Sequence, residues 1–314
     1  MKTYLVTGGA GFIGSNIVEE LVKRGERVKV IDNFITGRRE NLEPFLNKIE
    51  LIEGDIRDLS LMEKITRGVD YVLHQAAFRS VPKSVEDPTL CNDINISGTL
   101  NVLMAAHKSK VKRVVYASSS SVYGNTETFP QCENFFPEPL SPYGVSKLSG
   151  EYYCKVFSGT FGLETVSLRY FNVFGPRQNP ESKYSAVIPA FIAKMVKDEK
   201  PTIDGNGEQS RDFTYVSNVV EANLNAAIMK DISGAVVNVG CGESYSVIGI
   251  IKMINQFLGR DIEPIFGPSR KGDARKTQAD ITRLKDFLSL SPKVKFEDGL
   301  CKTVNWFKKS SKAR

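Results

Sequence analysis

A glycine-rich turn near the start of the chain constrains its fold most strongly. Residues 3–7 form an apolar run typical of a buried strand, and apolar side chains then recur at helical spacing, at Ile13, Ile17, Val18, Leu21 and Val22. The turn between these segments contains Gly8, Gly9, Gly11 and Gly14. Gly8 and Gly9 allow a tight bend, Gly11 lets the backbone approach a pyrophosphate, and Gly14 permits close helix packing. The pattern predicts phosphates bound at a helix N-terminus.

A second apolar run, at residues 28–31, ends in Asp32, which lies 18 residues after Gly14. This is close to the spacing at which an acidic residue hydrogen-bonds the adenosine ribose of a dinucleotide. A carboxylate at that place repels a ribose phosphate, so the sequence favours NAD over NADP as the cofactor. Arg38 and Arg39 would favour NADP if they faced the ribose, but we expect both to lie in a solvated loop.

Tyr143 and Lys147 are the candidate catalytic pair, in the segment Ser-Pro-Tyr-Gly-Val-Ser-Lys at residues 141–147. If Tyr143 begins a helix, Lys147 lies one turn later on the same face, about 6 Å along the axis. A tyrosine titrates near pH 10, so a tyrosine that acts as a base at neutral pH needs a cation beside it. Alone, this spacing is typical of an exposed helical pair. The serine run at residues 118–121 and the glycine turn favour a tyrosine base beside a nicotinamide.

Length and composition are those of an ordinary globular protein. The 314 residues exceed the usual size of one core, and 41% hydrophobic with 25% charged residues fits a soluble chain. No apolar run approaches the roughly 20 residues that span a bilayer, and the first residues read as a core strand rather than a signal peptide. We therefore expect a cytoplasmic protein that binds no membrane.

Metal and nucleic-acid binding are not indicated. The five cysteines are scattered without Cys-x-x-Cys spacing, so reduced packing thiols are expected. His74 and His107 are the two histidines and lack neighbours at zinc-ligand spacing; His74, at a strand end, is expected to be a structural hydrogen-bonding group. The net charge of +6 is modest. Arg211 and Arg270 suit the diphosphate of a nucleotide-linked substrate, and surface salt bridges also explain them.

Further apolar runs alternate with amphipathic segments. They predict strands at residues 49–52, 71–73, 113–116, 165–168 and 236–239. This alternation predicts an α/β fold with a doubly wound parallel (Rossmann) sheet and ligands at the carboxyl ends of the strands. Asp55, residues 75–77 and residues 117–119 follow such strand ends.

From Gly175 onward, prolines and glycines punctuate shorter elements, which indicates a smaller substrate-binding lobe. The strand at residues 236–239 returns the chain to the main sheet, so we expect the two parts to be interleaved. The predicted dinucleotide-binding part takes residues 1–174 plus about 213–240. The substrate lobe takes about 175–212 plus 241–314.

Together these motifs resemble the extended short-chain dehydrogenase/reductases, and within them the UDP-hexose 4-epimerases. The resemblance covers nearly the whole chain and rests on residues 7–14, 32–33, 55, 74–77, 118–124, 143–147, 169–175, 211–212 and 272–273. Segments 74–82 and 175–189 are most similar to the UDP-N-acetylglucosamine 4-epimerase branch. The resemblance implies that hydride leaves sugar carbon 4 for tightly bound NAD, that the 4-keto sugar rotates, and that hydride returns to its opposite face.

The resemblance also implies roles for individual residues. Tyr143 takes the proton of the 4-hydroxyl, Ser119 bonds that hydroxyl, and Lys147 holds the nicotinamide ribose and lowers the tyrosine pKa. Cofactor contacts are implied for Gly8, Gly11, Phe12, Ile13, Asp32, Asn33, Thr36, Gly37, Asp55, Ile56, Gln75, Ala76, Ala77, Arg79, Asn95, Ser118, Tyr143, Lys147 and Tyr170. A homodimer with a four-helix contact is implied, through apolar positions at Leu100, Val102, Leu103, Ala106, Leu148, Tyr152 and Val156.

Substrate contacts are implied for Ser119, Tyr143, Asn172, Val187, Arg211, Arg270, Asp273 and Thr277. Thr277 matches a gate on the N-acetyl pocket, where a small residue admits an acetamido group and a tyrosine blocks it. Two positions depart from the pattern: Arg79 replaces a small residue or a lysine, and Thr277 is bulkier than the serine of the N-acetyl branch. We expect activity on both UDP-GlcNAc and UDP-glucose, with the former preferred.

Other activities of the same family are alternatives. A 4,6-dehydratase needs an Asp-Glu pair where this chain has Ser120 and Ser121, and a UDP-glucuronate decarboxylase needs a carboxylate at the same place. A UDP-glucuronate epimerase is a further alternative. A non-catalytic NAD-sensing regulator would keep the glycine turn, but it has no need of Ser119, Tyr143 and Lys147 together.

Overall fold

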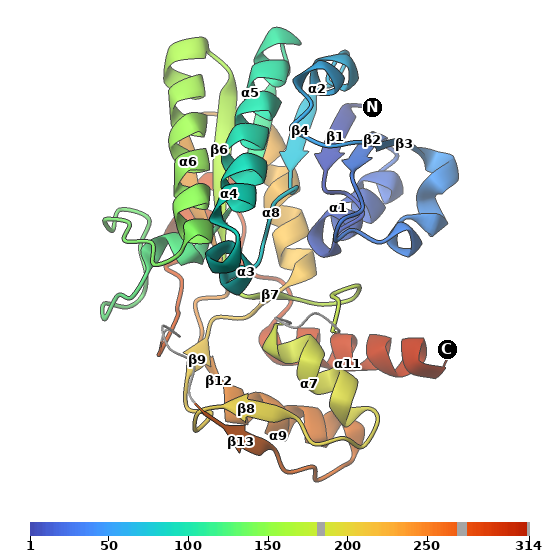
Figure 1. Cartoon of the computed structure of the whole chain (residues 1–314), viewed down its shortest axis with the longest axis vertical. Helices are drawn as coiled ribbons and strands as arrows, with labels where there is room; N and C mark the ends of the chain where they lie inside the picture. Colours follow the sequence, from blue (N-terminus) through green and yellow to red (C-terminus); the bar gives the residue numbers. More distant parts are fainter. Residues whose placement is uncertain (181–185, 269–274, 313–314) are drawn as a thin grey trace.

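A computed structural model describes residues 1–180, 186–268 and 275–312. A seven-stranded sheet forms the upper part of the molecule in Figure 1. In spatial order its strands are β11 (Ala235–Val239), β6 (Glu164–Tyr170), β5 (Arg113–Ser119), β4 (Tyr71–His74), β1 (Thr3–Thr7), β2 (Arg27–Asp32) and β3 (Ile49–Glu53). All neighbouring pairs are parallel, and the strand order reverses direction between β1 and β4. This confirms the predicted doubly wound α/β class.

Each face of the sheet carries its own hydrophobic core. In β1, Tyr4 and Val6 enter one core and Leu5 enters the other, because successive side chains of a strand point to opposite faces. The helices over the first face are α1 (Phe12–Lys23) and α8 (Val216–Ile228), and those over the second are α2 (Leu59–Ile65), α5 (Gly98–Lys108) and α6 (Pro142–Phe161). Strands covered on both faces carry consecutive apolar side chains, as at Tyr4, Leu5 and Val6 of β1, which made them visible in the sequence.

Short helices follow the strands at their carboxyl ends. They are η1 (Arg39–Asn41) and η2 (Glu43–Lys48) after β2, then α3 (Val81–Glu86), α4 (Pro88–Asn92) and the π-helical turn η3 (Asp93–Ser97) after β4, and η4 (Ser120–Tyr123) after β5. These elements surround the edge of the sheet at which the predicted site residues gather.

The lower part of the molecule consists of short strand pairs and helices (Figure 1). The pairs are β7 (Val173–Phe174) with β10 (Thr214–Tyr215), β8 (Thr202–Asp204) with β13 (Ile265–Gly267), and β9 (Ser210–Arg211) with β12 (Tyr245–Ser246). The helices are α7 (Val187–Met195), α9 (Val247–Leu258) and α11 (Phe296–Lys312), whereas α10 (Thr282–Leu288) packs against β11 and α8 of the upper part. The Phe296 ring lies 4.1 Å from that of Tyr245 and 5.5 Å from that of Phe174, so aromatic packing joins α11 to β12 and β7.

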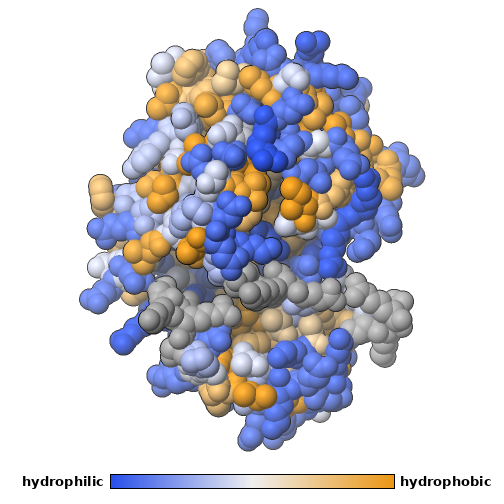
Figure 2. Space-filling model, viewed as in Figure 1, coloured by the Kyte–Doolittle hydropathy of each residue, from blue (hydrophilic) through white to orange (hydrophobic). Residues whose placement is uncertain are grey.

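The burial of three residues on helix α5 corrects part of the predicted dimer contact. Val102, Leu103 and Ala106 are fully buried against the chain's own sheet, so they are wrong as surface contact positions. Helical periodicity identifies the apolar stripe, but it does not say that the sheet already covers that stripe. Tyr152 and Val156 on α6 are 56% and 48% exposed. Figure 2, which has the same view as Figure 1, shows hydrophobic patches between hydrophilic ones on the upper part of the molecule.

None of the helices in the part of the chain that the structure describes is both long and apolar enough to cross a membrane.

Candidate active site

The glycine turn joins β1 to α1 so closely that side chains would collide. Gly8 has a φ of 67°, and a Cβ atom there would lie 2.7 Å from the Ala76 nitrogen. A Cβ atom on Gly14 would lie 2.2 Å from the Gly8 carbonyl oxygen. Gly11 precedes α1 without a side-chain capping bond. The first N–H groups of α1 therefore fit an anion such as a pyrophosphate.

Asp32, at the end of β2, is buried beside this turn. Its carboxylate accepts hydrogen bonds from the backbone nitrogens of Ala10 and Phe34, both 2.9 Å long. A Cβ atom on Gly37 would lie 2.6 Å from the same carboxylate, so this glycine lets the loop close over it. Burial raises the pKa of Asp32 despite the two backbone hydrogen bonds. The carboxylate is thus fixed where the sequence predicts a ribose ligand.

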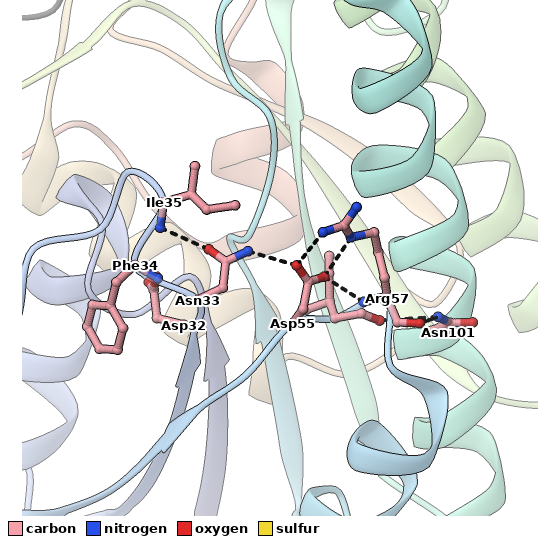
Figure 3. A network of polar contacts seen from close by, with 8 residues as sticks. Asp32, Asn33, Phe34, Ile35, Asp55, Arg57 and Asn101 are labelled. Carbon is pink, nitrogen blue, oxygen red and sulfur yellow. Dashed lines mark hydrogen bonds and ion pairs between the residues drawn. The ribbon is translucent and has the colours of Figure 1, made fainter.

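A polar network joins the ends of β2 and β3 (Figure 3). Asn33 Nδ2 donates to Asp55 Oδ2 over 2.8 Å, and Arg57 donates to both Asp55 oxygens over 3.0 and 2.9 Å. The hydrogen bonds from Arg57 lower the pKa of Asp55 to about 2, so this carboxylate is ionised at neutral pH. Sequence reasoning missed Arg57, although a cation two residues after an acid at a strand end is a readable signal.

Arg39 lies at the solvent-exposed surface, as expected, but it is not free in solution. It forms an ion pair with Glu53, and its guanidinium lies 4.1 Å from the centre of the Phe34 ring. Its charge is therefore paired with Glu53 at the surface and held against the Phe34 ring.

The side-chain amides of Gln75 and Asn223 and the hydroxyl of Tyr170 meet where β4 and β6 end. Asn223 Nδ2 donates to the Tyr170 hydroxyl over 2.8 Å, and that hydroxyl donates to Gln75 Oε1 over 3.2 Å. Gln75 Nε2 donates back to Asn223 Oδ1 over 3.0 Å. Gln75 and Tyr170 were predicted as cofactor residues. Asn223, on α8, was missed, because a polar residue within an apolar helix gives no signal of its partners.

Two other residues from the sequence analysis have partners inside the protein. His74 lies 2.7 Å from Thr7 Oγ1 and 3.0 Å from Thr99 Oγ1, and burial lowers its pKa to about 3, which confirms a structural, uncharged histidine. Asn95 accepts a hydrogen bond from the Phe78 nitrogen over 2.7 Å, so it holds the loop after β4. The remaining predicted cofactor residues lie nearby: Phe12 and Ile13 begin α1, Thr36 follows β2, Ile56 follows β3, Ala76 and Ala77 follow β4, and Ser118 is in β5.

The predicted catalytic residues come together at the carboxyl end of β5. Ser141 caps α6 by accepting a hydrogen bond from the Gly144 nitrogen, so Tyr143 lies in the first turn of the helix, as predicted. The side chain of Ser119, the last residue of β5, lies beside the Tyr143 hydroxyl and lowers its pKa. Lys147 Nζ lies 5.8 Å from the centre of the Tyr143 ring and donates to the Ala117 carbonyl over 2.7 Å.

The charges around Tyr143 differ from those expected. Burial raises the pKa of Tyr143, and the groups that oppose this rise are the Ser119 hydroxyl and Arg79. Burial lowers the pKa of Lys147 to about 8. Arg79, which the sequence assigned to the cofactor, therefore also acts on the phenol. The Ser119 hydroxyl and Arg79 both favour the phenolate of Tyr143.

Two of the predicted substrate residues are bonded to each other in the lower part of the site. Asn172 Nδ2 donates to Thr277 Oγ1 over 3.1 Å and to the Asp212 carbonyl over 3.0 Å. The Asp212 carboxylate accepts hydrogen bonds from the Cys241, Gly242 and Ala279 nitrogens over 2.8, 2.8 and 3.0 Å. Burial raises its pKa to about 6.

The other predicted substrate residues are placed less fully. Val187 is the first residue of α7, and Arg211 is in β9, where its guanidinium donates to the Ser210 carbonyl. Arg270 and Asp273 lie outside the described residues. Within residues 1–180, 186–268 and 275–312, no group of three or more His, Cys, Asp and Glu side chains could hold a metal ion.

Comparison with known proteins agrees with this geometry. Residues 4–240 match the model of the NAD dependent epimerase/dehydratase family. A putative UDP-glucose 4-epimerase of Methanocaldococcus jannaschii is 41% identical over 98% of this chain and 99% of its own length. The chain therefore belongs to this family, and it is an enzyme of the extended short-chain dehydrogenase/reductase type.

Two solved structures are similar over nearly their whole length. The UDP-N-acetylglucosamine 4-epimerase from Methanobrevibacter ruminantium, in complex with UDP-N-acetylmuramic acid, is 42% identical with a TM-score of 0.94, covering 98% of this chain and 99% of that one. The UDP-glucose 4-epimerase of Thermotoga maritima with UDP-glucose is 40% identical with a TM-score of 0.94 and the same coverage.

Proposed function

We propose that the protein is a UDP-sugar 4-epimerase that retains NAD. The observation that carries this proposal is the meeting of Tyr143, Ser119 and Lys147 at the carboxyl end of β5. NAD, when bound, supplies reversible hydride acceptance at sugar carbon 4. A catalytic tyrosine beside such a cofactor suits removal and return of hydrogen at a secondary alcohol.

The chain's own residues would then handle the proton. Tyr143 takes the proton of the sugar 4-hydroxyl as the alcohol becomes a ketone, and it returns this proton after the sugar has rotated. Ser119, beside the phenol, orients the same hydroxyl. Arg79 favours the phenolate form. Lys147, held by the Ala117 carbonyl, would hold the nicotinamide ribose.

The upper part of the molecule would hold the cofactor. The α1 N-terminus suits the pyrophosphate, Asp32 suits the adenosine ribose, and Asp55 with Asn33 suits the adenine side. Asp32 repels a ribose phosphate, which supports NAD over NADP. Five free cysteines support a reducing compartment, the cytoplasm.

The lower part, from about residue 175, would hold the UDP-sugar. The Asn172 amide and the small Thr277 side chain support a pocket that accepts an acetamido group, so we propose UDP-GlcNAc as the preferred substrate and UDP-glucose as a second one. A homodimer through α5 and α6 would use exposed positions such as Tyr152, Val156 and Met104.

Incubating the protein separately with UDP-GlcNAc and UDP-glucose, and resolving the 4-epimers by chromatography, tests this function. We expect UDP-GalNAc and UDP-galactose to form without added NAD, and Tyr143→Phe to form neither at a comparable rate. Decarboxylated or dehydrated products, or no conversion by NAD-loaded protein, would contradict the proposal.

A further inference from the structure

A buried ion pair lies directly behind the catalytic residues. Glu151 on α6 accepts hydrogen bonds from Arg169 on β6, over 2.9 Å from Nε and 2.7 Å from Nη2. It also accepts one from the Ser118 hydroxyl on β5 over 2.5 Å. The two charged side chains are only 3% and 4% exposed. The proposed reaction uses neither of them.

The pair belongs to a regular contact between α6 and the end of β5. Ala117, Ser118 and Ser119 are consecutive, and they contact Lys147, Glu151 and Tyr143 in that order. The three α6 residues are spaced four apart, so they share one face of the helix. In the sheet, Ser118 is registered opposite Arg169 and Ser119 opposite Tyr170. The ion pair therefore fixes Ser118. This residue lies between Ala117, which contacts Lys147, and Ser119, which contacts Tyr143.

Stability alone does not account for such a pair. Desolvating two charges is costly, and apolar replacements of buried ion pairs are often no less stable. One Arg169 nitrogen, Nη1, is buried without a hydrogen-bond partner, although the guanidinium also lies 4.7 Å from the Tyr123 ring. The charge of Glu151 therefore has a role other than stabilising the fold.

We propose that Glu151, with its charge compensated by Arg169, is a positioning residue for the catalytic set: it fixes Ser118 beside Ser119 and supplies a negative charge one helical turn from the Lys147 ammonium. The proposal rests on the function proposed above for Tyr143 and Lys147.

The groups around Lys147 support this role. Burial lowers the Lys147 pKa, and Cys91 of α4 with Cys154 and Glu151 of α6 oppose the change. The pKa values of both thiols are raised by burial, so neither thiol is charged at neutral pH. The other titratable groups that face Lys147 are Tyr116 of β5, Tyr143 of α6 and His74 of β4, and all three are uncharged at neutral pH in the structure. Glu151 is therefore the source of negative charge there.

The test compares Glu151→Gln, the double variant Glu151→Gln/Arg169→Gln, and the control Glu164→Gln. Glu164 pairs with Arg113 at the opposite end of the same two strands, so its variant removes a β5–β6 ion pair far from Lys147. Turnover is measured against pH, thermal unfolding reports stability, and NMR of lysine-labelled protein, assigned with Lys147→Arg, follows the ammonium directly.

Removing the carboxylate lowers the Lys147 pKa, so the ammonium is lost at a lower pH. We expect the basic limb of the rate profile and the NMR titration to move down by at least about half a pH unit in both Glu151 variants. The double variant should be more stable than Glu151→Gln, because no uncompensated buried cation remains. Glu164→Gln should leave both curves in place. A double variant whose curves coincide with those of the parent would overturn the inference. Absence of epimerisation by the parent would count against the proposed function alone, because the NMR titration still decides the role of Glu151.

Discussion

The Thr277 hydroxyl accepts hydrogen bonds from Asn172 Nδ2 over 3.1 Å and from the Asp212 nitrogen over 3.2 Å. A substitution at this position therefore changes the support of Asn172 as well as the room beside the sugar. Thr277→Val keeps the volume but leaves two donors without their acceptor, whereas Thr277→Tyr also fills space. The two variants separate these effects.

We expect Thr277→Tyr to abolish turnover of UDP-GlcNAc and to lower turnover of UDP-glucose no further than Thr277→Val does, because both variants lose the hydrogen bonds to the Thr277 hydroxyl. Thr277→Val should lower both activities together, by roughly tenfold for the lost hydrogen bonds. Steady-state kinetics on both substrates provides the check. Equal loss of both activities in Thr277→Tyr would show that Thr277 is not a gate for the acetamido group.

Tyr143→Phe should lower the rate of epimerisation by at least about a hundredfold, because the phenol carries the transferred proton. Affinity for UDP should be nearly unchanged, since the phenol lies at the sugar end of the proposed site. Tyr152→Phe is the matched control: it removes a hydroxyl from an exposed tyrosine of the same helix. Titration calorimetry with UDP and the rate assay together test the prediction, and near-parental turnover by Tyr143→Phe would contradict it.

NAD should copurify with the protein, and denaturing extraction followed by chromatography will measure it. Gly11→Ala should lose NAD while folding normally, because a Cβ atom there meets only the Gly8 oxygen, at 3.1 Å, and φ is −73°. The control is Gly159→Ala in α6, where a Cβ atom has no neighbour within 4 Å. Extraction of NADP instead, or full NAD content in Gly11→Ala, would be the contrary result.

The contribution of Asp212 to the stability of the folded protein should fall as the pH rises, which is the opposite of the usual behaviour of a carboxyl group. Burial raises the pKa of this carboxyl to about 6, so the folded state holds an extra proton between about pH 4 and pH 6. Its contribution is present at low pH and is lost as the pH rises through 6. In Asp212→Asn, urea unfolding measured between pH 4 and pH 7 should lack this decline. Asp55→Asn is the opposite case: the pKa of Asp55 is about 2, so its contribution is lost as the pH falls.

Val156→Glu and Tyr152→Arg should yield monomers if α5 and α6 form the subunit contact, because both residues are exposed on α6. Light scattering across a range of concentrations is the measurement. Ile228→Glu, at an equally exposed apolar position on α8, should leave the assembly unchanged. A parent protein that is monomeric at every concentration would contradict the proposed dimer.

Much of the fold could be predicted because the sheet is covered on both faces. The segments at residues 71–73 and 113–116 are largely apolar for that reason, and they become β4 (Tyr71–His74) and β5 (Arg113–Ser119). The family's motifs also placed Ser119, Tyr143 and Lys147, which the structure brings together at one strand end.

Residues that act through distant partners could not be predicted in this way. Asn223 reaches Gln75 across 148 positions, and Glu151 meets Arg169 only because α6 turns one face to β5 and β6. Sequence periodicity gives the spacing of such a face, but not its rotation about the helix axis. The same limit explains why Val102, Leu103 and Ala106 were misplaced in the dimer contact.

The hydrogen bonds of the Asp212 carboxylate join three segments of the chain, at residues 212, 241–242 and 279, at the boundary between the sheet and the lower elements. A connection of this kind resists a hinge motion of the lower elements away from the sheet, because wide opening would break three hydrogen bonds at once. We infer that the two sides of the proposed site keep their spacing during a catalytic cycle. A sugar that presents both faces to the same atoms would then turn within a site of fixed width, so the mobility that epimerisation requires would belong to the substrate.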